Sequence, residues 1–396
     1  MLGDISSLIN SGSYYLSQPS LSTTAPANTN CLLGVAQQPA VNAGSLVSSA
    51  VTWAKPSMLD FGIDVGALNE KLQLSFDWYH RKVRDLYGPV QQYPGILGVS
   101  PPQINNASVE TKGFDMTVSW SDRIGALSYS ARFVLSNYKG KVLSYPNPAG
   151  STGTWYNGQA MGAIWGYETA GLFQSDDEIG HAPSQTAIWG TWHPGDVRYK
   201  DLNGDNKIDY GNNTLSNPGD QKVIGNGTPQ YSYGFTLSLG YKGFDFQAFL
   251  QGVGKRDYAP GWSTFFWGIP GSGSEWASQV LVTNLNRYTA ETPNGYFPRY
   301  YLSGENSKNQ QTQSRYLLNA AYLRLKNLQL GYTVPAHITR RAHIGRLRVY
   351  GSAENLFTIA PGLNKKFQID PELLISDGNI YPISRAFAIG VNLDIQ

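Results

Sequence analysis

The chain has 396 residues, of which 15% are charged and 13% aromatic, and its formal net charge is +2. A net charge this small gives no broad basic surface, and we therefore expect no nucleic-acid partner. The one cysteine, Cys31, cannot form an internal disulfide. No run of 18 or more apolar residues is present, which excludes an ordinary transmembrane helix.

The first 58 residues differ from the rest of the chain. They are rich in Ser, Ala, Asn and Gly and show little sustained alternation of apolar and polar residues. The first seven residues contain no Lys or Arg before a short apolar stretch, unlike a secretory signal peptide. We therefore expect residues 1–58 to be a weakly structured start, a loop with one or two weak strands.

Regular alternation starts near Leu59. Apolar residues occupy every second position over 59–65 and again over 72–78, and the turn at 69–71 separates the two runs. A second pair follows over 114–120 and 127–135, separated by a turn at 122–125. Runs of this period joined by short turns predict antiparallel hairpins.

The clearest hairpin spans residues 231–250. Aromatic and aliphatic residues from Tyr231 to Tyr241 alternate with Ser, Gly and Thr, and the pattern resumes at Phe244 after Lys242-Gly243. Further strands are expected over 317–334, 346–355 and 384–395. In the first of these the apolar phase slips by one residue between Leu325 and Leu328, which predicts a β-bulge.

About nine strands are expected, most of them near the 9–11 residues that cross a bilayer at a tilt. A soluble β-sandwich would also alternate. The polar sides here carry Gly, Ser, Asp, Gln and Arg, as a wet lumen would, and the apolar sides end in aromatic residues typical of an interfacial girdle. Those aromatic residues are Trp78, Trp120, Tyr231, Tyr241 and Tyr332. The pattern predicts an all-β fold, an antiparallel transmembrane β-barrel.

Several motifs occur in a characteristic order over roughly residues 58–396. They are 58–64, 201–209, 241–245, 249–254, 256–258, 322–332, 347–350, 354–357 and 381–385. In order and spacing they resemble the C-terminal barrel portion of the SusC-like (SusC/RagA) family of TonB-linked outer-membrane transporters. The resemblance implies that the nine or ten strands counted here are part of a larger barrel, because transporters of this type have roughly 22 strands and a plugged lumen.

The same resemblance implies a function. We expect energy-coupled import of an oligomeric nutrient, a glycan or a peptide, across the outer membrane, with lipid around the barrel. A SusD-like surface lipoprotein and the TonB complex would be the partners, the latter through an N-terminal part not visible here. The alternative is a non-transporting surface protein, either an adhesin-like barrel or the degenerate remnant of a transporter.

Two long segments, 139–230 and 253–315, lack clear strands. Connections of this length usually have a task, and the long loops of such barrels are extracellular. Exposed aromatic faces in them could stack on sugar rings or pack against a partner protein, or they could form small cores of the loops themselves. Seven of the ten tryptophans lie here: Trp155, Trp165, Trp189, Trp192, Trp262, Trp267 and Trp276.

An acidic stretch in the first of these loops has the spacing of calcium ligands. Asp201, Asn203, Asp205, Lys207 and Asp209 occupy positions 1, 3, 5, 7 and 9 of an EF-hand-like count, Lys207 through its carbonyl. Asn at position 6 tolerates the left-handed conformation that is needed there, but Asn at position 12 replaces the bidentate Glu. The spacing predicts a structural Ca²⁺ site; an Asx-rich loop without metal is the alternative.

Nothing in the sequence indicates an enzyme. The five histidines show neither metal-ligand spacing nor a partner nucleophile, and the Gly-rich stretches lack the strand–loop–helix context of a phosphate site. We therefore expect no catalytic residues and no cofactor besides the possible calcium ion.

Overall fold

The computed structural model describes residues 52–88, 104–268, 281–301, 304–340, 343–363, 367, 369–374, 381 and 383–395, and the backbone of four short strands before residue 44. The chain divides into two compact units. The larger comprises residues 60–79, 112–139 and 161–396, and the smaller comprises 1–59, 80–111 and 140–160. No helix in the described residues is both long enough and apolar enough to span a membrane.

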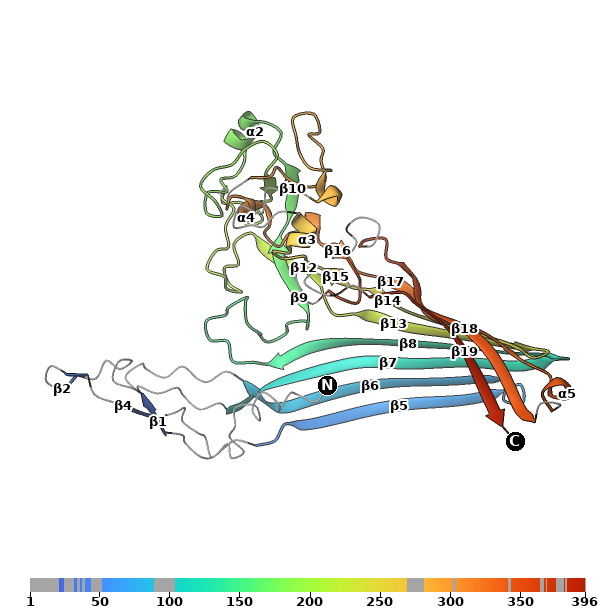
Figure 1. Cartoon of the computed structure of the whole chain (residues 1–396). Helices are drawn as coiled ribbons and strands as arrows, with labels where there is room; N and C mark the ends of the chain where they lie inside the picture. The colour runs from blue at the N-terminus through green and yellow to red at the C-terminus, as the bar shows by residue number, and fades with distance from the viewer. Residues whose placement is uncertain are drawn as a thin grey trace. The chain divides into compact units, whose positions relative to one another are not determined.

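Nine antiparallel strands form the main sheet (Figure 1), in the order β19-β18-β17-β14-β13-β8-β7-β6-β5. Each strand pairs with the one before it in this nine-strand series, as in the wall of a barrel, and the predicted hairpins and the strand number are confirmed. The strands are β5 (Lys55–Ala67), β6 (Leu72–Gly88), β7 (Ile104–Ile124), β8 (Leu127–Ser144), β13 (Gln230–Tyr241), β14 (Phe244–Lys255), β17 (Tyr322–Thr333), β18 (Ile344–Ile359) and β19 (Ala386–Ile395).

The β13–β14 hairpin shows how sequence sets the register. Tyr241 pairs with Phe244 across a two-residue turn, in which Lys242 and Gly243 have φ of 46° and 90°. Two positive φ values suit the twist of a tight hairpin, which explains the glycine. The predicted bulge in β17 is also confirmed, because its register shifts against β14 and again, between Leu325 and Asn327, against β18.

Three strands, β6, β7 and β8, extend furthest beyond their predicted bounds. β6, β7 and β8 contain 17, 21 and 18 residues, whereas 9–11 residues cross a bilayer. The predicted end of β6 was near Trp78, where apolar alternation stops. The ladder continues beyond it with polar side chains, and His80 of β6 contacts Glu110 of β7 at 3.0 Å. Backbone pairing does not require apolar side chains, so the apolar pattern marks only the expected membrane-spanning part of each strand.

The described part of the first 58 residues contains short hairpin-like pairs. β1 (Leu21–Thr24) pairs with β4 (Ala40–Ala43), and β2 (Leu32–Leu33) pairs with β3 (Ala36–Gln37). β5 then starts at Lys55, four residues before the expected start of regular alternation at Leu59.

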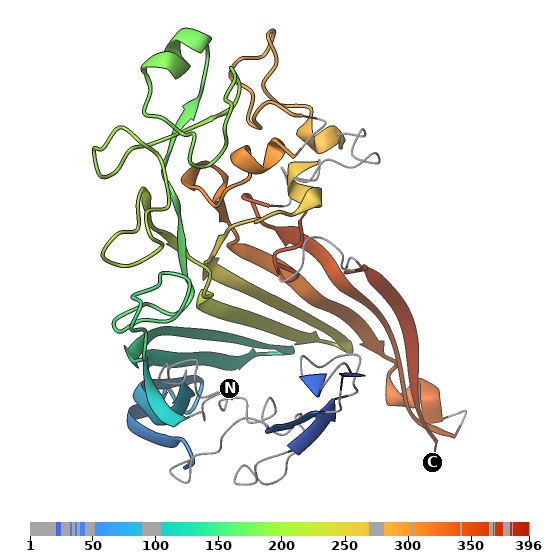
Figure 2. The ribbon, with the colours of Figure 1, turned by 90° about the vertical axis from the view of Figure 1, so that its left-hand side faces the viewer.

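The larger unit also carries a folded loop domain, here defined as the described residues of 161–229, 256–321 and 360–374 (Figure 2). The two segments expected to lack strands contain short ones: β9 (Ala163–Tyr167) pairs with β12 (Gln221–Asn226), β10 (Thr169–Leu172) with β11 (Val197–Tyr199), and β15 (Asp257–Tyr258) with β16 (Leu318–Asn319). Helical turns complete the domain: α2 (Asp176–His181), α3 (Thr264–Trp267), η4 (Val282–Asn284), α4 (Asn306–Asn309) and η5 (Ser314–Tyr316), while α5 (Ala336–Thr339) lies between β17 and β18.

The loop domain has its own hydrophobic core. Phe266, Trp267, Phe297 and Tyr316 are each at most 1% exposed and pack edge to face or stacked on one another. Val197 and Ile208 bring the first long segment into the same core, and Leu363 brings the segment after β18. Three stretches that are distant in the sequence therefore fold together.

Candidate functional site

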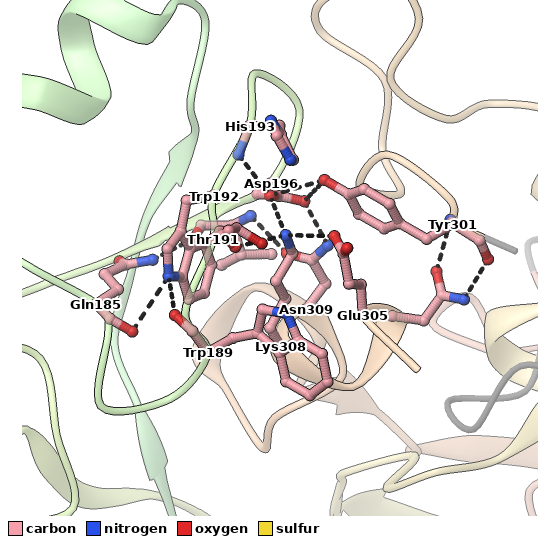
Figure 3. A network of polar contacts seen from close by, with 12 residues as sticks. Gln185, Trp189, Thr191, Trp192, His193, Asp196, Tyr301, Glu305, Lys308 and Asn309 are labelled. Carbon is pink, nitrogen blue, oxygen red and sulfur yellow. Dashed lines mark hydrogen bonds and ion pairs between the residues drawn. The ribbon is translucent and has the colours of Figure 1, made fainter. Parts of the chain in front are cut away.

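A buried ion pair joins the two longest segments of the loop domain (Figure 3). The Nζ atom of Lys308, in α4, lies 2.7 Å from Oδ2 of Asp196, and both side chains are fully buried. Lys308 also donates to the backbone carbonyl of Thr191 at 2.9 Å. Its ammonium also contacts the Glu305 carboxylate at 3.3 Å. It lies 4.4 Å from the ring centroid of Tyr301 and 5.3 Å from that of Trp192, so two aromatic rings flank the charge.

Asp196 collects hydrogen bonds from both segments. It accepts from the Tyr301 hydroxyl at 2.8 Å, from the Asn309 side-chain amide at 2.8 Å and from the His193 backbone N–H at 2.8 Å. Burial, and next the charge of Asp196, raise the pKa of Tyr301 well above its usual value, so this hydroxyl stays a donor. A buried carboxylate is tolerated only with such partners, because an uncompensated charge in the interior is costly.

A second cluster attaches the segment after β18 to the sheet. Arg324 of β17 is 2% exposed and reaches Asp370 at 2.5 Å and Glu372 at 2.7 Å. Its Nε donates to the Thr358 hydroxyl of β18 at 2.7 Å, and Lys326 contacts the same Glu372 at 2.9 Å. Two cations and two anions therefore balance at the base of the loop domain.

A third ion cluster lies on the surface of the domain. Glu168 accepts hydrogen bonds from Lys200 and Lys222, which come from beyond β11 and from β12. These two bonds lower the pKa of Glu168 to about 2. Together the three clusters tie the long segments into one body, which presents a defined surface instead of separate mobile loops.

The predicted tryptophans occupy different environments. Trp267 is 1% exposed inside the core, and Trp192 packs against that core while its indole N–H donates to the backbone carbonyls of Gln185 and Trp189. Trp165 and Trp189 are half-buried. Trp262 is 53% exposed and Trp155 is 41% exposed. Trp276 lies outside the described residues.

Only the exposed tryptophans among these can present a ring to a sugar or a partner without rearrangement of the core. Trp267 and Trp192 match the alternative in which the rings form a core of the loops. Trp155 belongs to the smaller unit, where it contacts the ring of Tyr145 at 5.6 Å between centroids. Within the loop domain, Trp262 is therefore the most accessible of the described tryptophans named as contact candidates.

The acidic loop adopts a wound conformation stabilised by its own side chains. The Asp201 carboxylate accepts from the backbone N–H of Gly204 at 2.6 Å and of Asn206 at 2.8 Å. The Asn203 side chain accepts from the Asp205 N–H at 3.0 Å, and the Asp205 carboxylate accepts from the Lys207 N–H at 2.8 Å. Asn206 has φ of 62°, the left-handed conformation expected at position 6. Ile208, fully buried, anchors the loop to the core.

Sequence reasoning missed one carboxylate of this loop. Asp220 is fully buried and accepts from the backbone N–H of Leu202 at 2.7 Å and of Asp209 at 2.9 Å. Burial, opposed by these two hydrogen bonds and reinforced by the charges of Asp201 and Asp205, raises its pKa. The 12 positions of an EF-hand-like count end at Asn212, so the count does not include Asp220. The chain reverses over residues 210–219, and this reversal brings Asp220 back beside the acidic loop.

The donor set fits a hard cation in its chemistry, since it supplies carboxylate, amide and carbonyl oxygens. As the side chains stand, no group of three or more His, Cys, Asp or Glu residues within the described part of the chain is placed to hold a metal ion. Hydrogen bonds within the loop explain its present conformation. The calcium site stays a prediction.

Comparison with known proteins gives relatives for most of the chain. No family model matches the sequence. TonB-dependent receptor P3 of Formosa agariphila is 28% identical over 365 residues, which is 86% of this chain and 34% of that protein. TonB-dependent receptor SusC of Bacteroides thetaiotaomicron is 22% identical over 361 residues, 86% of this chain and 32% of SusC. The chain thus spans about a third of the length of these relatives.

Solved structures show the same fold. The RagAB peptide importer in its "open-open" state matches with a TM-score of 0.71 at 21% identity, over 97% of this chain and 38% of that chain. A second RagAB peptide transporter structure matches with a TM-score of 0.69 over 96% of this chain. In sequence and in fold the chain is therefore similar to a portion of SusC-like TonB-dependent receptors, and the partial coverage fits the C-terminal part of their β-barrel.

Proposed function

We propose that this chain forms part of the wall and the outer loops of an outer-membrane transporter that imports an oligomeric nutrient with a SusD-like lipoprotein partner. The relatives are TonB-dependent receptors, and one structural neighbour is described as a peptide importer. The observation that carries the proposal furthest is the loop domain. It is a folded, ion-paired body on the long-loop side of a barrel sheet, where the long loops of such barrels are extracellular.

Trp262 is the contact that we assign to cargo or partner within this domain. Its ring is 53% exposed and follows Gly261, which has φ of 54°. A left-handed glycine turns the chain sharply just before the ring. The neighbouring Trp267 indole donates to the Gly261 carbonyl at 2.7 Å, so the turn is fixed to the core below it. An aromatic ring on a rigid support loses little entropy on binding.

The acidic loop has a structural role in this proposal. We infer that Ca²⁺ binds to oxygens of Asp201, Asn203, Asp205, Lys207 and Asp209, with Asp220 supplying the carboxylate that position 12 lacks. Burial raises the pKa of Asp220, and the charges of Asp201 and Asp205 add to this; a cation bound beside it would favour the ionised carboxylate. Binding would have to draw the side chains together. The ion would stiffen the segment that leads into β13.

Uptake by cells tests the transport proposal. Cells expressing the full-length receptor and its lipoprotein partner are given fluorescent oligosaccharides or oligopeptides, with and without an intact TonB system. We expect TonB-dependent uptake of one class, and at least a fivefold loss in Trp262→Ala with unchanged receptor abundance. Glu291→Gln, an exposed change elsewhere in the loop domain, serves as the control. Surface binding of cargo with no TonB-dependent uptake would favour the adhesin-like or remnant reading instead.

A further inference from the structure

The buried Lys308–Asp196 pair of the loop domain holds the two reactants of an amide bond in contact. An amine and a carboxyl group condense when they are held together, when the carboxyl carbon is polarised and when water is kept away. Nζ of Lys308 lies 2.7 Å from Oδ2 of Asp196, and both side chains are fully buried. Groups held in this way can react with an effective concentration on the order of 10⁵–10⁸ M. The pair therefore has the contact and the dry surroundings that the condensation needs.

A second carboxylate contacts the same nitrogen and is placed to take its proton. Oε2 of Glu305 lies 3.3 Å from Nζ of Lys308, and Glu305 is the N-cap residue of α4, three positions before Lys308 (Figure 3). Only the neutral amine has the free lone pair that attacks a carbon atom. Charges are costly in a buried site, so a proton transfer that neutralises the ammonium is also favoured by the surroundings.

The other oxygen of Asp196 has the donors that an attacked carbonyl needs. Oδ1 accepts from the Asn309 side-chain amide at 2.8 Å and from the Tyr301 hydroxyl at 2.8 Å, and this hydroxyl is shared with Oδ2 at 2.9 Å. Donors fixed on one oxygen stabilise the negative charge that it gains when an amine adds to the carbon, as in an oxyanion hole. Oδ1 is therefore held to remain as the carbonyl oxygen, and Oδ2, beside the ammonium, is placed to leave.

We propose that Lys308 and Asp196 become joined by an intramolecular amide bond, with Glu305 as the proton carrier. Glu305 takes a proton from the Lys308 ammonium and passes it to Oδ2 of Asp196. The lone pair of Nζ then forms a bond to Cγ, and Nζ gives up a second proton, which reaches Oδ2 by the same route. The Cγ–Oδ2 bond breaks, its electrons leave with the oxygen as one water molecule, and Glu305 is again a carboxylate. The condensation needs no oxidant, reductant or co-reactant.

The surroundings of the pair already satisfy the product. The new amide keeps one N–H, and the Thr191 carbonyl, 2.9 Å from Nζ, accepts from it. The carbonyl oxygen of the amide, formerly Oδ1, keeps its donors on Asn309 and Tyr301. Two buried charges are replaced by one neutral group, which costs less to bury. The ion pair is thus the reactant arrangement, and the amide requires no new partner.

Such a bond would tie the two long segments of the loop domain where a disulfide cannot. The chain has one cysteine, Cys31, which cannot form an internal disulfide. Asp196 and Lys308 are 112 positions apart, and a cross-link that closes a long loop restricts the unfolded chain strongly. Unlike a disulfide, an amide is not broken by thiols. The bond forms whatever cargo the receptor carries.

Mass spectrometry of the wild-type full-length receptor, denatured and then digested with trypsin, tests this directly. Trypsin cuts after a lysine with a free ammonium, so it should not cut after Lys308. The fragment 300–315 should stay joined to the fragment that contains Asp196, and their combined mass should be lower by one water molecule. Lys71 lies 2.8 Å from Asp122 in an exposed pair, so cleavage after Lys71 is the matched control. Release of 300–308 as a free fragment, with no joined species, would overturn the proposal.

Variants separate the chemistry from the contact. Glu305→Gln keeps the size of the side chain but cannot take a proton, so the yield of joined fragments should fall at least fivefold. Lys308→Arg keeps a positive charge beside Asp196 but has no amine, so no joined fragments should form. Glu291→Gln, an exposed change elsewhere in the domain, should leave the yield unchanged. An unchanged yield in Glu305→Gln would show that Glu305 does not carry the proton, and the proposed reaction would be wrong.

Discussion

Removing the buried ammonium of Lys308 should loosen the loop domain more than any surface change. In Lys308→Met the side chain keeps its length but loses its contacts to Asp196, Glu305 and Thr191, and Asp196 stays buried with only neutral donors. Breaking a buried pair by removing one partner costs about 3–5 kcal/mol. The three neutral donors that remain to Asp196 favour the lower half of that range.

The expected change is large enough to measure locally. Since every 1.4 kcal/mol is tenfold, about 3 kcal/mol corresponds to roughly a 150-fold rise in local opening. Hydrogen–deuterium exchange of the full-length receptor should show this rise in β10, β11 and α4, while the sheet strands stay protected. Asp196→Asn combined with Lys308→Met should cost less than the two single changes added together, because the charge that was left unpaired is gone.

A matched control uses a lysine of the same domain. Lys222 is half exposed in its surface pair with Glu168, so Lys222→Met should leave exchange within about threefold of the wild type. If Lys308→Met also stays within about threefold, the buried pair does not hold the two segments together, and the account of the domain as one body is wrong.

Three further predictions concern other parts of the chain. Val391→Arg on the apolar face of β19 should cost about 2–4 kcal/mol near the bilayer midplane. A cysteine placed at position 391 should be protected from an aqueous labelling reagent, whereas one at position 392 should be labelled. The reverse pattern would show that the two faces are assigned wrongly. Calcium should slow proteolysis of the acidic loop in the wild type and not in Asp220→Asn, and equal cleavage with calcium and with chelator would leave only the Asx-turn explanation. Because the pKa of Glu168 is lowered to about 2 from an ordinary 4.5, its contribution to stability is present above pH 4.5 and is lost as pH falls towards 2. The protection of β12, corrected for the pH dependence of intrinsic amide exchange, should therefore fall slightly more over that interval in the wild type than in Glu168→Gln; an equal fall in both would refute this.

The sheet was predictable from sequence because its signals are local. The two-residue period of apolar side chains, the short turns and the phase slip near Leu325 are each visible within about a dozen residues, and each appears in the structure. Pairing partners are also close in the chain for most hairpins. The parts of β6, β7 and β8 that lie beyond the apolar runs were missed because backbone pairing continues after the apolar alternation stops.

The loop domain could not be predicted in the same way. Asp196 and Lys308 are 112 positions apart, and either alone looks like a solvated charge. Arg324 alternates with Leu323 and Leu325, so its position predicts a side chain that faces a wet lumen. Nothing in the sequence around Asp370 indicates that Asp370 pairs with Arg324. Trp262 and Trp267 lie five residues apart, one exposed and one buried, with no periodicity to distinguish them. Contacts between distant segments decide these roles.

The small residue Gly331 lies next to an ion pair in which Arg348 of β18 donates to both oxygens of Asp245 of β14, at 2.5 and 3.0 Å, and this has an evolutionary consequence. Gly331, Asp245 and Arg348 lie on three neighbouring strands, and a Cβ at position 331 would lie 2.6 Å from the ends of the other two side chains, which would have to shift. A substitution at one position therefore changes what the other two can accommodate. Among homologous receptors these three positions should covary as a set: lineages that keep the ion pair keep glycine, and lineages that replace the glycine lose both charges.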